Sequence, residues 1–471
     1  MAMGFLISES QYAFFPGRQI LDCVLVANEA IDSVSKSKEK GVAFKVDFQK
    51  AYDTVSWDFL LKILQVCGFG NLWCQWIQSC ISSTFILVIV NGSPIENFPI
   101  SRGLRQGCSL SPLLFNLVGE ALNLMLRKAS QLGLFEGFKI GRSVERIQIS
   151  HLQFADDLLI FCGASEIQIK NVKRVLQVLE ISSWLKLNMS KSKLFGINVS
   201  NDCIEAWANS IGSLWGKLPT DYLGLPLGAK RNSIALWKPV IQKFHHRLEG
   251  WQPHILSIGG RLMLIRSVLT SLPLCFLSIF KIPVSVTKKF NSMMATFLWV
   301  GSNSSHKVHW VNWQRLCLPL SAGGLGINNI ETLNWSLLYK RAMRYGNETH
   351  KLWRRLITAK TQSDPAGLLP IPCNANNVSW IWNSIAKNYA KEDQLGKLFR
   401  DNLSLQVGYG SKVLFWDDVW CSQSLLKEAF PKVYALSIKK SGFINDFGGK
   451  FENRWVWNIP LRRSPFDWET E

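Results

Sequence analysis

Two adjacent carboxylates in a short turn are the residues of this chain best suited to chemistry. Asp156 and Asp157 lie between two apolar runs, HLQF and LLIF, which predict the two strands of a hairpin. Two like charges about 4 Å apart repel by roughly 4 kcal/mol at an effective dielectric constant near 20. A divalent cation would relieve this repulsion, and so would solvent. On its own, an Asp-Asp pair in a turn is more often a solvated turn than a metal site.

A third carboxylate, Asp47, ends an apolar run at 41–48 that predicts a buried strand. If the hairpin of 147–163 pairs beside this strand, all three carboxylates meet at one edge of a sheet. Hard oxygen ligands suit Mg²⁺, which binds through few carboxylates plus substrate phosphates. Two such ions about 3.5–4 Å apart support in-line phosphoryl displacement. From these residues alone, the metal site and an ordinary turn both remain open.

The first 230 residues alternate strands and helices around these carboxylates. A helix through WDFLLKIL follows the first strand, with Asp53 or Ser56 as its cap. The run 83–92 predicts a strand that ends in an Asn-Gly turn, with FPISRG as its hairpin partner. Two further helices are expected. One runs to about Arg127, with Ser111 at its cap and Pro112 in its first turn, and the other covers 166–186. This order predicts an α+β fold, an antiparallel sheet backed by helices.

The later sequence is helical and then rich in tryptophan. Apolar residues recur at three- and four-residue steps over 237–250, 259–272 and 286–300. A Pro- and Asn-containing stretch at 365–377 is typical of a linker, and the last hundred residues are partly β-like. We therefore expect three regions, at 1–230, 231–346 and 347–471.

Composition restricts the partners and the compartment. The net charge of +19 favours a polyanionic partner, nucleic acid first and an anionic membrane surface second. Eleven cysteines without a C-x-x-C pair argue against a zinc ribbon, a redox motif or a disulfide framework. The N-terminus lacks a signal-peptide pattern, and the apolar stretch 267–280 is too short to span a bilayer. We expect no transmembrane helix, no membrane partner, and a location in the nucleus, the cytoplasm or both.

Five motifs in a fixed order carry a family resemblance. They are QYAFFPGRQILD (11–22), FKVDFQKAYDTVSW (44–57), GLRQGCSLSPLLFNLV (103–118), the FADD hairpin and YLGLPLG (222–228). This series closely resembles the reverse transcriptases of LINE-type (non-LTR) retrotransposons, most of all those of flowering plants. The resemblance implies a right-hand polymerase, with fingers and palm over 1–230, a helical thumb over 231–346 and a Trp-rich C-terminal extension.

The resemblance also implies a role for each matching residue. Asp47, Asp156 and Asp157 would hold two Mg²⁺ ions, with Mn²⁺ as a substitute, and no zinc is expected. Tyr52 would exclude ribonucleotides by filling the space of the 2′-hydroxyl. The other residues implied to contact the nucleotide are Arg18, Phe48, Gln106 and Gly107. Lys191 would protonate the departing pyrophosphate, and the turn Tyr222, Leu223 and Gly224 would grip the primer.

The implied function is RNA-directed DNA polymerase, with an RNA template, a DNA primer and dNTPs as partners. Full elements of this family also carry an upstream fingers segment, an endonuclease domain and a zinc knuckle. We therefore expect a chain that is incomplete at both ends, with an endonuclease supplied in trans as a further candidate partner. The alternative is a catalytically inactive or domesticated nucleic-acid-binding relic. An RNA-dependent RNA polymerase is disfavoured by Tyr52.

Two other groups of residues could attract attention without a catalytic role. Asp417 and Asp418 form a second carboxylate pair in FWDDVW, which we interpret as a capped or solvated turn. His245 and His246 lie within a predicted helix and have no further ligand at metal-binding spacing. We interpret them as surface or packed side chains.

Overall fold

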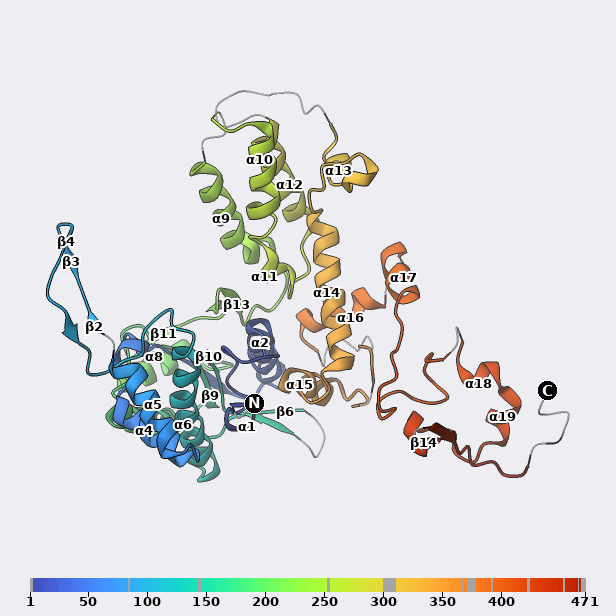
Figure 1. Cartoon of the computed structure of the whole chain (residues 1–471), viewed down its shortest axis with the longest axis horizontal. Helices are drawn as coiled ribbons and strands as arrows, with labels where there is room; N and C mark the ends of the chain where they lie inside the picture. The colour runs from blue at the N-terminus through green and yellow to red at the C-terminus, as the bar shows by residue number, and fades with distance from the viewer. Residues whose placement is uncertain are drawn as a thin grey trace. The chain divides into compact units, whose positions relative to one another are not determined.

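The computed structural model describes residues 3–83, 85–141, 146–251, 255–299, 311–365, 367–370, 378–390, 393–421, 424–451, 454–464 and 466. The chain divides into two compact units, each made of several segments (Figure 1). Unit 1 comprises residues 1–338, 350–363 and 373–384, and unit 2 comprises 339–349, 364–372 and 385–471. The predicted linker at 365–377 lies mostly outside the described residues.

The centre of unit 1 is a five-stranded sheet in the order β11-β10-β1-β9-β8. Its strands are β1 (Gly41–Val46), β8 (His151–Phe154), β9 (Asp157–Gly163), β10 (Lys193–Ile197) and β11 (Leu214–Gly216). All neighbours are antiparallel except β10 and β11. The middle strand β1 is buried between β9 and β10, as its nearly continuous apolar run predicts. The predicted α+β class, with an antiparallel sheet backed by helices, is confirmed.

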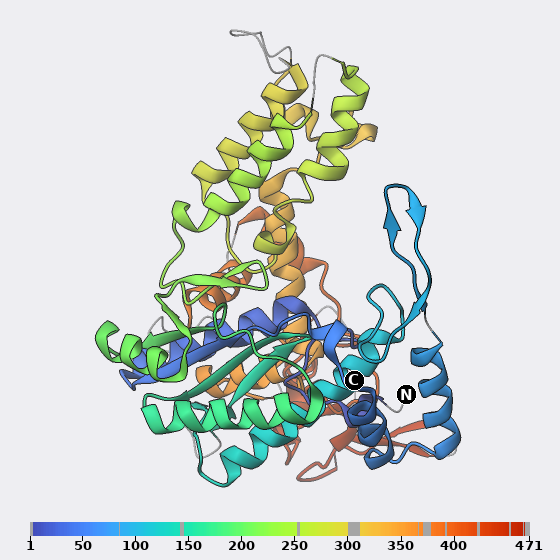
Figure 2. The ribbon, with the colours of Figure 1, turned by 90° about the vertical axis from the view of Figure 1, so that its left-hand side faces the viewer.

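Helices cover both faces of this sheet (Figure 2). The elements around it are α1 (Met3–Leu6), α2 (Ile20–Ser37), α3 (Ala51–Thr54), α4 (Trp57–Val66), α5 (Asn71–Ser82), α6 (Ser111–Gln131), β6 (Phe138–Ile140), β7 (Ile147–Ile149), α7 (Glu166–Ser183) and α8 (Asn201–Ile211). Val42, Phe44 and Val46 of β1 share one buried core with α4, α6, α7 and α8. The intervening residues of β1 face the side that α2 covers, because successive strand residues point to opposite faces.

The sequence predicts the starts of α4 and α6 closely. The cap of α4 is one of the two expected residues, and the cap position of α6 is one residue before the expected one. The Ser56 side chain accepts a hydrogen bond from the Phe59 N–H, so Ser56 caps α4 and Asp53 does not. Helix α6 begins at Ser111 with Leu110 at the cap position, so the expectation that Ser111 itself is the cap is wrong. Pro112 lies in the first turn of α6, where its missing N–H costs no hydrogen bond.

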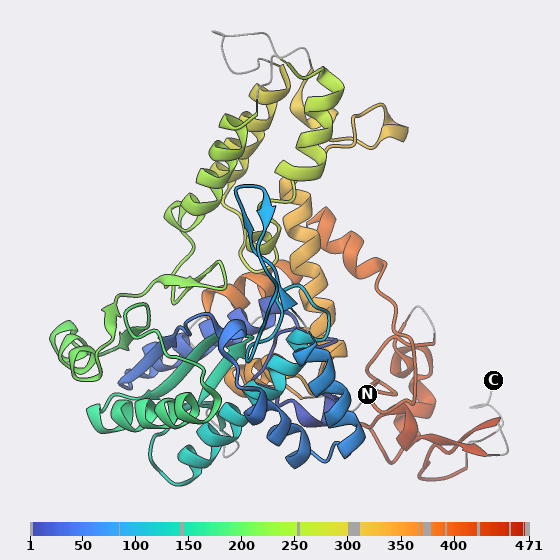
Figure 3. The same cartoon turned by 60° about the vertical axis from the view of Figure 1, so that its left-hand side comes forward.

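A long hairpin rises from the loop between α5 and α6 (Figure 3). It comprises β2 (Phe85–Ile86), β3 (Ile89–Val90), β4 (Ser93–Pro94) and β5 (Phe98–Pro99). Asn91 and Gly92 have φ angles of 51° and 81°, which fits the two-residue turn that the Asn-Gly pair predicts. Its large apolar side chains are 40–69% exposed, so this hairpin buries little of its own hydrophobic surface.

The later part of unit 1 is helical, as its periodicity predicts. Its elements are β12 (Thr220–Tyr222), β13 (Leu225–Leu227), η1 (Ile234–Trp237), α9 (Lys238–Glu249), α10 (Ile258–Leu264), a π-helical turn η2 (Ile265–Leu269), α11 (Leu274–Leu277), α12 (Val284–Trp299), α13 (Trp313–Leu316) and η3 (Leu320–Ala322). Phe244 of α9 stacks on Phe290 of α12, with ring centroids 4.4 Å apart. His245 and His246 are exposed on α9, which confirms their reading as surface residues.

Two segments after residue 346 pack into unit 1. They contain α15 (Leu352–Thr361) and the start of α16 (Trp380–Tyr389), and α15 packs against α2. Lys360 of α15 donates to the carboxylates of Glu29 and Asp32 at 2.7 Å and 2.6 Å. Ser379 donates a hydrogen bond to the other Glu29 oxygen. Residues far apart in the sequence are thus joined through α2.

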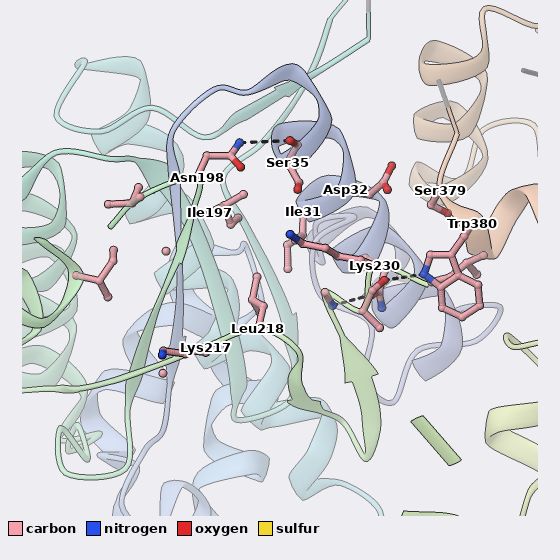
Figure 4. A pocket seen from close by; sticks show the side chains of 18 of the residues that line it. Ile31, Asp32, Ser35, Ile197, Asn198, Lys217, Leu218, Lys230, Ser379 and Trp380 are labelled. Carbon is pink, nitrogen blue, oxygen red and sulfur yellow. Dashed lines mark hydrogen bonds between the residues drawn. The ribbon is translucent and has the colours of Figure 1, made fainter. Parts of the chain in front are cut away.

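A cavity of about 270 Å³ lies beside this junction (Figure 4). Its wall includes Asp32 of α2, Asn198 after β10, Lys230 after β13, and Ser379 and Trp380. The Trp380 indole N–H donates to the Ala229 carbonyl at 2.6 Å, which ties the start of α16 to the chain just after β13.

Unit 2 has a small aromatic core of its own, built around Phe415, Trp416 and Phe447. Its elements are the end of α14 (Ile330–Asn347), the end of α16, α17 (Gln394–Asp401), α18 (Leu426–Ala429), α19 (Pro431–Leu436), η4 (Ile444–Asp446), β14 (Gly448–Phe451) and β15 (Arg454–Trp457). In FWDDVW, Asp417 pairs with Lys427 at 2.7 Å and Asp418 accepts from the Leu414 N–H. These contacts confirm a capped turn.

Within the described part of the chain, no helix is long and apolar enough to cross a membrane. The boundaries expected at 230 and 346 stay predictions.

Burial of His151 in β8 gives the fold a pH dependence. Burial, with a smaller effect of Arg127, lowers the pKa of His151 to about 4, from an ordinary value near 6.5. As the pH falls, His151 is therefore protonated in the unfolded chain at a higher pH than in the folded protein. This preference lowers the free energy of unfolding below about pH 6.5. The expected loss is about 2 kcal/mol by pH 5. Urea unfolding at pH 7 and pH 5 would measure it, and His151→Asn should flatten the difference. His245→Asn, at an exposed histidine, should leave it unchanged; an equal effect of both variants would contradict this assignment.

Candidate active site

Strand register places two of the three predicted carboxylates opposite each other. The last registered pair of β1 and β9 is Val46 with Leu158, so the next residues outward are Asp47 and Asp157. Directly opposed residues of an antiparallel pair point to the same face and lie about 4.5–5.5 Å apart at Cβ. Both aspartates are half-buried, whereas Asp156 is exposed in the adjoining two-residue turn. The sheet therefore brings Asp47, Asp156 and Asp157 to one edge, as predicted.

The electrostatics of Asp157 reflect this crowding. Burial raises the pKa of its carboxyl, the Asp156 charge raises it further, the Lys45 ammonium lowers it, and Asp47 raises it again. The folded protein thus disfavours the charged form of Asp157 when only these side chains surround it. A bound cation would reverse that preference, because an opposite charge nearby favours ionisation.

Lys45 is a site residue that the sequence analysis missed. It lies two residues before Asp47 on the same face of β1, and its ammonium group donates to the Asp221 carbonyl at 3.1 Å. Lys45 therefore lies between the carboxylate edge and the β12–β13 hairpin. Strand alternation could have found it, since any polar residue two positions before Asp47 shares its face.

The backbone of Asp47 is held by the turn that carries Lys191. The Asp47 N–H donates to the buried Ser192 hydroxyl at 3.0 Å, and its carbonyl accepts from the Asn188 N–H at 2.8 Å. Lys191 is exposed in this turn, and its N–H donates to the Asn188 carbonyl. The structure thus places Lys191 beside the strand end that carries Asp47.

Tyr52 lies on α3, the first helix after β1. Its ring stacks on the buried Phe115 of α6, with centroids 4.5 Å apart and planes 14° apart. Burial, and then the charge of Asp156, raise the pKa of Tyr52 to about 12. Its hydroxyl has no hydrogen-bond partner among the described residues. Phe48, which follows Asp47, is buried and bridges to Leu187.

The loop with Gln106 and Gly107 is fixed against the segment that carries Tyr52. The Leu104 N–H donates to the Tyr52 carbonyl at 2.6 Å, and the Gln106 amide donates to Asp53 at 3.3 Å. Gly103 has φ of 87° and lies so close that a Cβ would be 2.6 Å from the Asp53 carbonyl oxygen. Gly107 has φ of 83°, and a Cβ there would meet nothing within 4 Å. The loop therefore presents open backbone at Gly107.

The predicted primer-grip residues form a tight hairpin. Leu223 and Gly224 connect β12 to β13 with φ angles of 52° and 73°, which fits a type I′ turn. The Tyr222 ring is buried, and its hydroxyl shares a 3.5 Å hydrogen bond with the Cys23 thiol. Burial of Tyr222 is the main cause of its raised pKa, and the charges of Cys23 and Asp157 add to it.

Arg18 is bound to the N-terminal segment of the chain. Its guanidinium donates to the carbonyls of Ile7, Ser8 and Gln11 and lies over the Phe15 ring, 4.3 Å from the centroid. Burial lowers its pKa. In this arrangement Arg18 ties the N-terminal segment together, and its contact with a triphosphate stays a prediction.

The donor set at the strand edge fits a divalent metal, although it is not a closed ligand cage. No group of three His, Cys, Asp or Glu side chains is already gathered to hold an ion within the ranges that the structure describes. Magnesium sites that act on nucleotides take several ligands from substrate phosphates and water, so one or two carboxylates suffice. The gathering of the three carboxylates at this edge favours the fit, because burial and then the charge of Asp156 raise the pKa of Asp157, and a cation would oppose both effects.

The segment that contains this edge is similar to known proteins. The model of the family "Reverse transcriptase (RNA-dependent DNA polymerase)" matches residues 2–227. A putative ribonuclease H protein of Arabidopsis thaliana is 30% identical over 43% of this chain and 32% of its own length. The transposon TX1 uncharacterized 149 kDa protein of Xenopus laevis is 26% identical over 72% of this chain and 25% of its own.

The Pol polyprotein of the type-1 retrotransposable element R2 of Popillia japonica is 32% identical over 26% of this chain and 19% of its own. The chain thus spans about a third or less of the length of these relatives. The matched family segment contains the carboxylate edge, Tyr52, the Gln106 loop and the β12–β13 hairpin. Residues 2–227 thus match the reverse transcriptase family, and the similar proteins include those of a transposon and of a retrotransposable element.

Proposed function

We propose that this chain is an RNA-directed DNA polymerase that extends a DNA primer on an RNA template. The observation that carries the proposal is that Asp47 and Asp157 directly follow the last registered pair of β1 and β9, beside Asp156 and inside the matched segment. The net charge of +19 supports a nucleic-acid partner, because basic chains attract phosphate backbones.

In the proposed reaction, the primer 3′-oxygen bonds to the α-phosphorus of a dNTP as the bond to pyrophosphate breaks. Asp47, Asp156 and Asp157 would hold two Mg²⁺ ions, with Mn²⁺ as a substitute. When bound, such ions activate the attacking oxygen and stabilise the leaving one. The protein's own contribution is orientation of the reactants and placement of charge.

Other residues supply binding and proton transfer in this proposal. Lys191 is exposed beside the strand end of Asp47, where its ammonium group could give a proton to the leaving pyrophosphate. Gly107 allows a template or nucleotide to approach the backbone closely. The Leu223-Gly224 turn would contact the primer end. Lys45 links this hairpin to β1 through its hydrogen bond to the Asp221 carbonyl.

Primer extension on an RNA template tests the function directly. The full chain is incubated with Mg²⁺ and either dNTPs or NTPs, and Asp156→Asn serves as the inactive control. DNA synthesis that this substitution abolishes supports the proposal. Salt-sensitive binding of an RNA–DNA duplex without any extension supports the inactive nucleic-acid-binding relic. Extension with NTPs in preference to dNTPs contradicts DNA synthesis as the function.

Replacing Tyr52 with valine is expected to weaken discrimination against ribonucleotides by about 10- to 100-fold. The stacked Phe115 prevents the Tyr52 ring from retreating, and forcing an extra atom against a packed group costs about 1–3 kcal/mol. The ratio of kcat/KM for a dNTP to that for the matching NTP measures the effect. Tyr52→Phe keeps the ring and should keep the discrimination. If Phe and Val variants lose it equally, the hydroxyl and not the ring is responsible.

A further inference from the structure

The turn that carries the carboxylate pair contains a residue in an unfavourable backbone conformation. Ala155 is the first residue of the two-residue loop between β8 and β9, and its φ is 53°. Glycine is the usual residue at such a position, because a Cβ is unfavourable in the left-handed region. Some contact must therefore hold Ala155 in place, directly before Asp156.

Two buried amide side chains hold both backbone polar groups of Ala155. The Gln11 side-chain oxygen accepts from the Ala155 N–H at 3.2 Å and from the Ala13 N–H at 3.0 Å. The Gln153 side-chain amide donates to the Ala155 carbonyl at 3.0 Å. Gln11 and Gln153 are only 2% and 3% exposed, so water does not replace either contact. An amide satisfies these groups, whereas an apolar side chain would leave buried polar groups unpaired, which is unfavourable.

The two glutamines are themselves fixed by backbone pairing. Gln11 and Gln153 form a parallel bridge, in which the Tyr12 N–H donates to the Gln153 carbonyl and the Gln153 N–H donates to the Ser10 carbonyl, both at 2.8 Å. The segment 10–13 thus lies as a short strap along β8. On its other side, the Asn116 amide of α6 donates to the Ala13 carbonyl at 2.8 Å.

Helix α6 leaves room for the Gln153 amide through a glycine. A Cβ at Gly119 would lie 2.6 Å from the Gln153 side-chain nitrogen, closer than real Cβ atoms come. Gly119 is a helical residue, where glycine is less favourable than alanine. The close approach of Gln153 gives that glycine a physical reason.

We infer that Gln11 and Gln153 are positioning residues that set the direction of the Asp156 and Asp157 carboxylates by holding Ala155 at positive φ. The inference rests on the proposed function for its catalytic meaning, although the geometry stands without it. When either amide is lost, Ala155 relaxes toward negative φ and the carboxylates leave the edge that they share with Asp47. A glycine at 155 needs no such support, because it adopts positive φ without cost.

The test combines loss of the amide with rescue by glycine. Gln153→Met in the full chain keeps the volume and removes the hydrogen bond. It should weaken Mn²⁺ affinity, followed without nucleic acid by the shift of the melting temperature, by about tenfold or more. The Mg²⁺ concentration for half-maximal primer extension should rise in parallel. Adding Ala155→Gly to Gln153→Met should restore most of both values.

Three further variants decide between positioning and general damage to the fold. Gln148→Met removes an exposed amide on β7 and should leave Mn²⁺ affinity unchanged. Gln11→Met should reproduce the effect of Gln153→Met, and it is the variant to use if the latter does not fold. Ala155→Gly alone should bind Mn²⁺ as the unaltered chain does. Mn²⁺ affinity within twofold of the unaltered chain in Gln153→Met, or a loss that glycine does not rescue, would overturn the inference.

Failure of the proposed function has a different signature. If the unaltered chain binds Mn²⁺ but extends no primer, the polymerase proposal fails. The Mn²⁺ affinities of the glutamine variants and their rescue by glycine still test the positioning role. If the chain extends primers and Gln153→Met does so with unchanged Mg²⁺ dependence, only the positioning role fails.

Discussion

Asp47→Asn is expected to reduce primer extension by about a thousandfold while leaving the fold intact. Asp47 and Asp157 are the next residues beyond the last registered pair of β1 and β9, so loss of Asp47 removes one of the charges at the carboxylate edge. A metal-bound carboxylate contributes several kcal/mol of transition-state stabilisation, and about 4 kcal/mol corresponds to a thousandfold in rate. Single-turnover extension of an annealed RNA–DNA primer–template measures the loss.

The fold should survive this substitution because the contacts of Asp47 to Ser192 and Asn188 are made by its backbone. Asparagine keeps both. A melting temperature equal to or above that of the unaltered chain is therefore expected in the absence of metal, since the change also removes repulsion at Asp157. Asp58→Asn, at an exposed carboxylate of α4, is the matched control and should extend primers normally. Substantial extension by Asp47→Asn would remove the basis for the proposed chemistry.

Lys360→Ala is expected to lower the free energy of unfolding by about 3–5 kcal/mol. Lys360 is 6% exposed and Glu29 is 0% exposed, so removing the ammonium group leaves a buried carboxylate without its cation. Burial alone would lower the pKa of Lys360, but Glu29 and Asp32 outweigh it and raise the pKa instead. Denaturant unfolding of the full chain, followed by tryptophan fluorescence, measures the change.

The double variant Lys360→Met with Glu29→Gln separates the ion pair from simple packing. It removes both charges of the buried pair, and replacing both partners of such a pair is often neutral. Asp32, the other carboxylate that Lys360 contacts, is 20% exposed and keeps its ion pair with Lys36 at 3.3 Å. It should therefore recover most of the stability that Lys360→Ala loses. Lys351→Ala, at the residue before α15, is the matched single change and should cost little. If Lys360→Ala lowers the free energy of unfolding by less than 1 kcal/mol, the ammonium group of Lys360 is not needed to keep Glu29 buried.

Much of the chemistry at the carboxylate edge could be predicted because it is local in the sequence. The Asp-Asp pair lies between two apolar runs, and those runs are β8 and β9. Ser56 precedes an amphipathic run and caps α4, and the Asn-Gly pair turns the exposed hairpin. Each of these signals depends on neighbours within a few positions, where turn and cap chemistry is decisive.

The remaining contacts could not be predicted because they join distant residues. Gln11 reaches Ala155 across 144 positions, and Glu29 meets Lys360 across 331. Neither pair follows a periodic pattern or a turn motif in the sequence. The sequence therefore does not indicate which buried polar residues become partners. The stretch 259–272 reads as one regular helix, yet η2 departs from it at residues 265–269. The change to a π-helical turn depends on tertiary packing, which the local sequence pattern does not predict.

The dependence of Glu29 on Lys360 and Ser379 has a consequence during protein synthesis. A ribosome that has completed the segment matched by the family model, which ends at residue 227, must add about 150 more residues before Ser379 exists. At about 5–20 residues per second this delay is roughly 8–30 s. Throughout that time helix α2 carries an unpaired carboxylate on a surface that is later buried. We expect the nascent domain to reach its final stability only after α15 and the start of α16 have emerged from the exit tunnel.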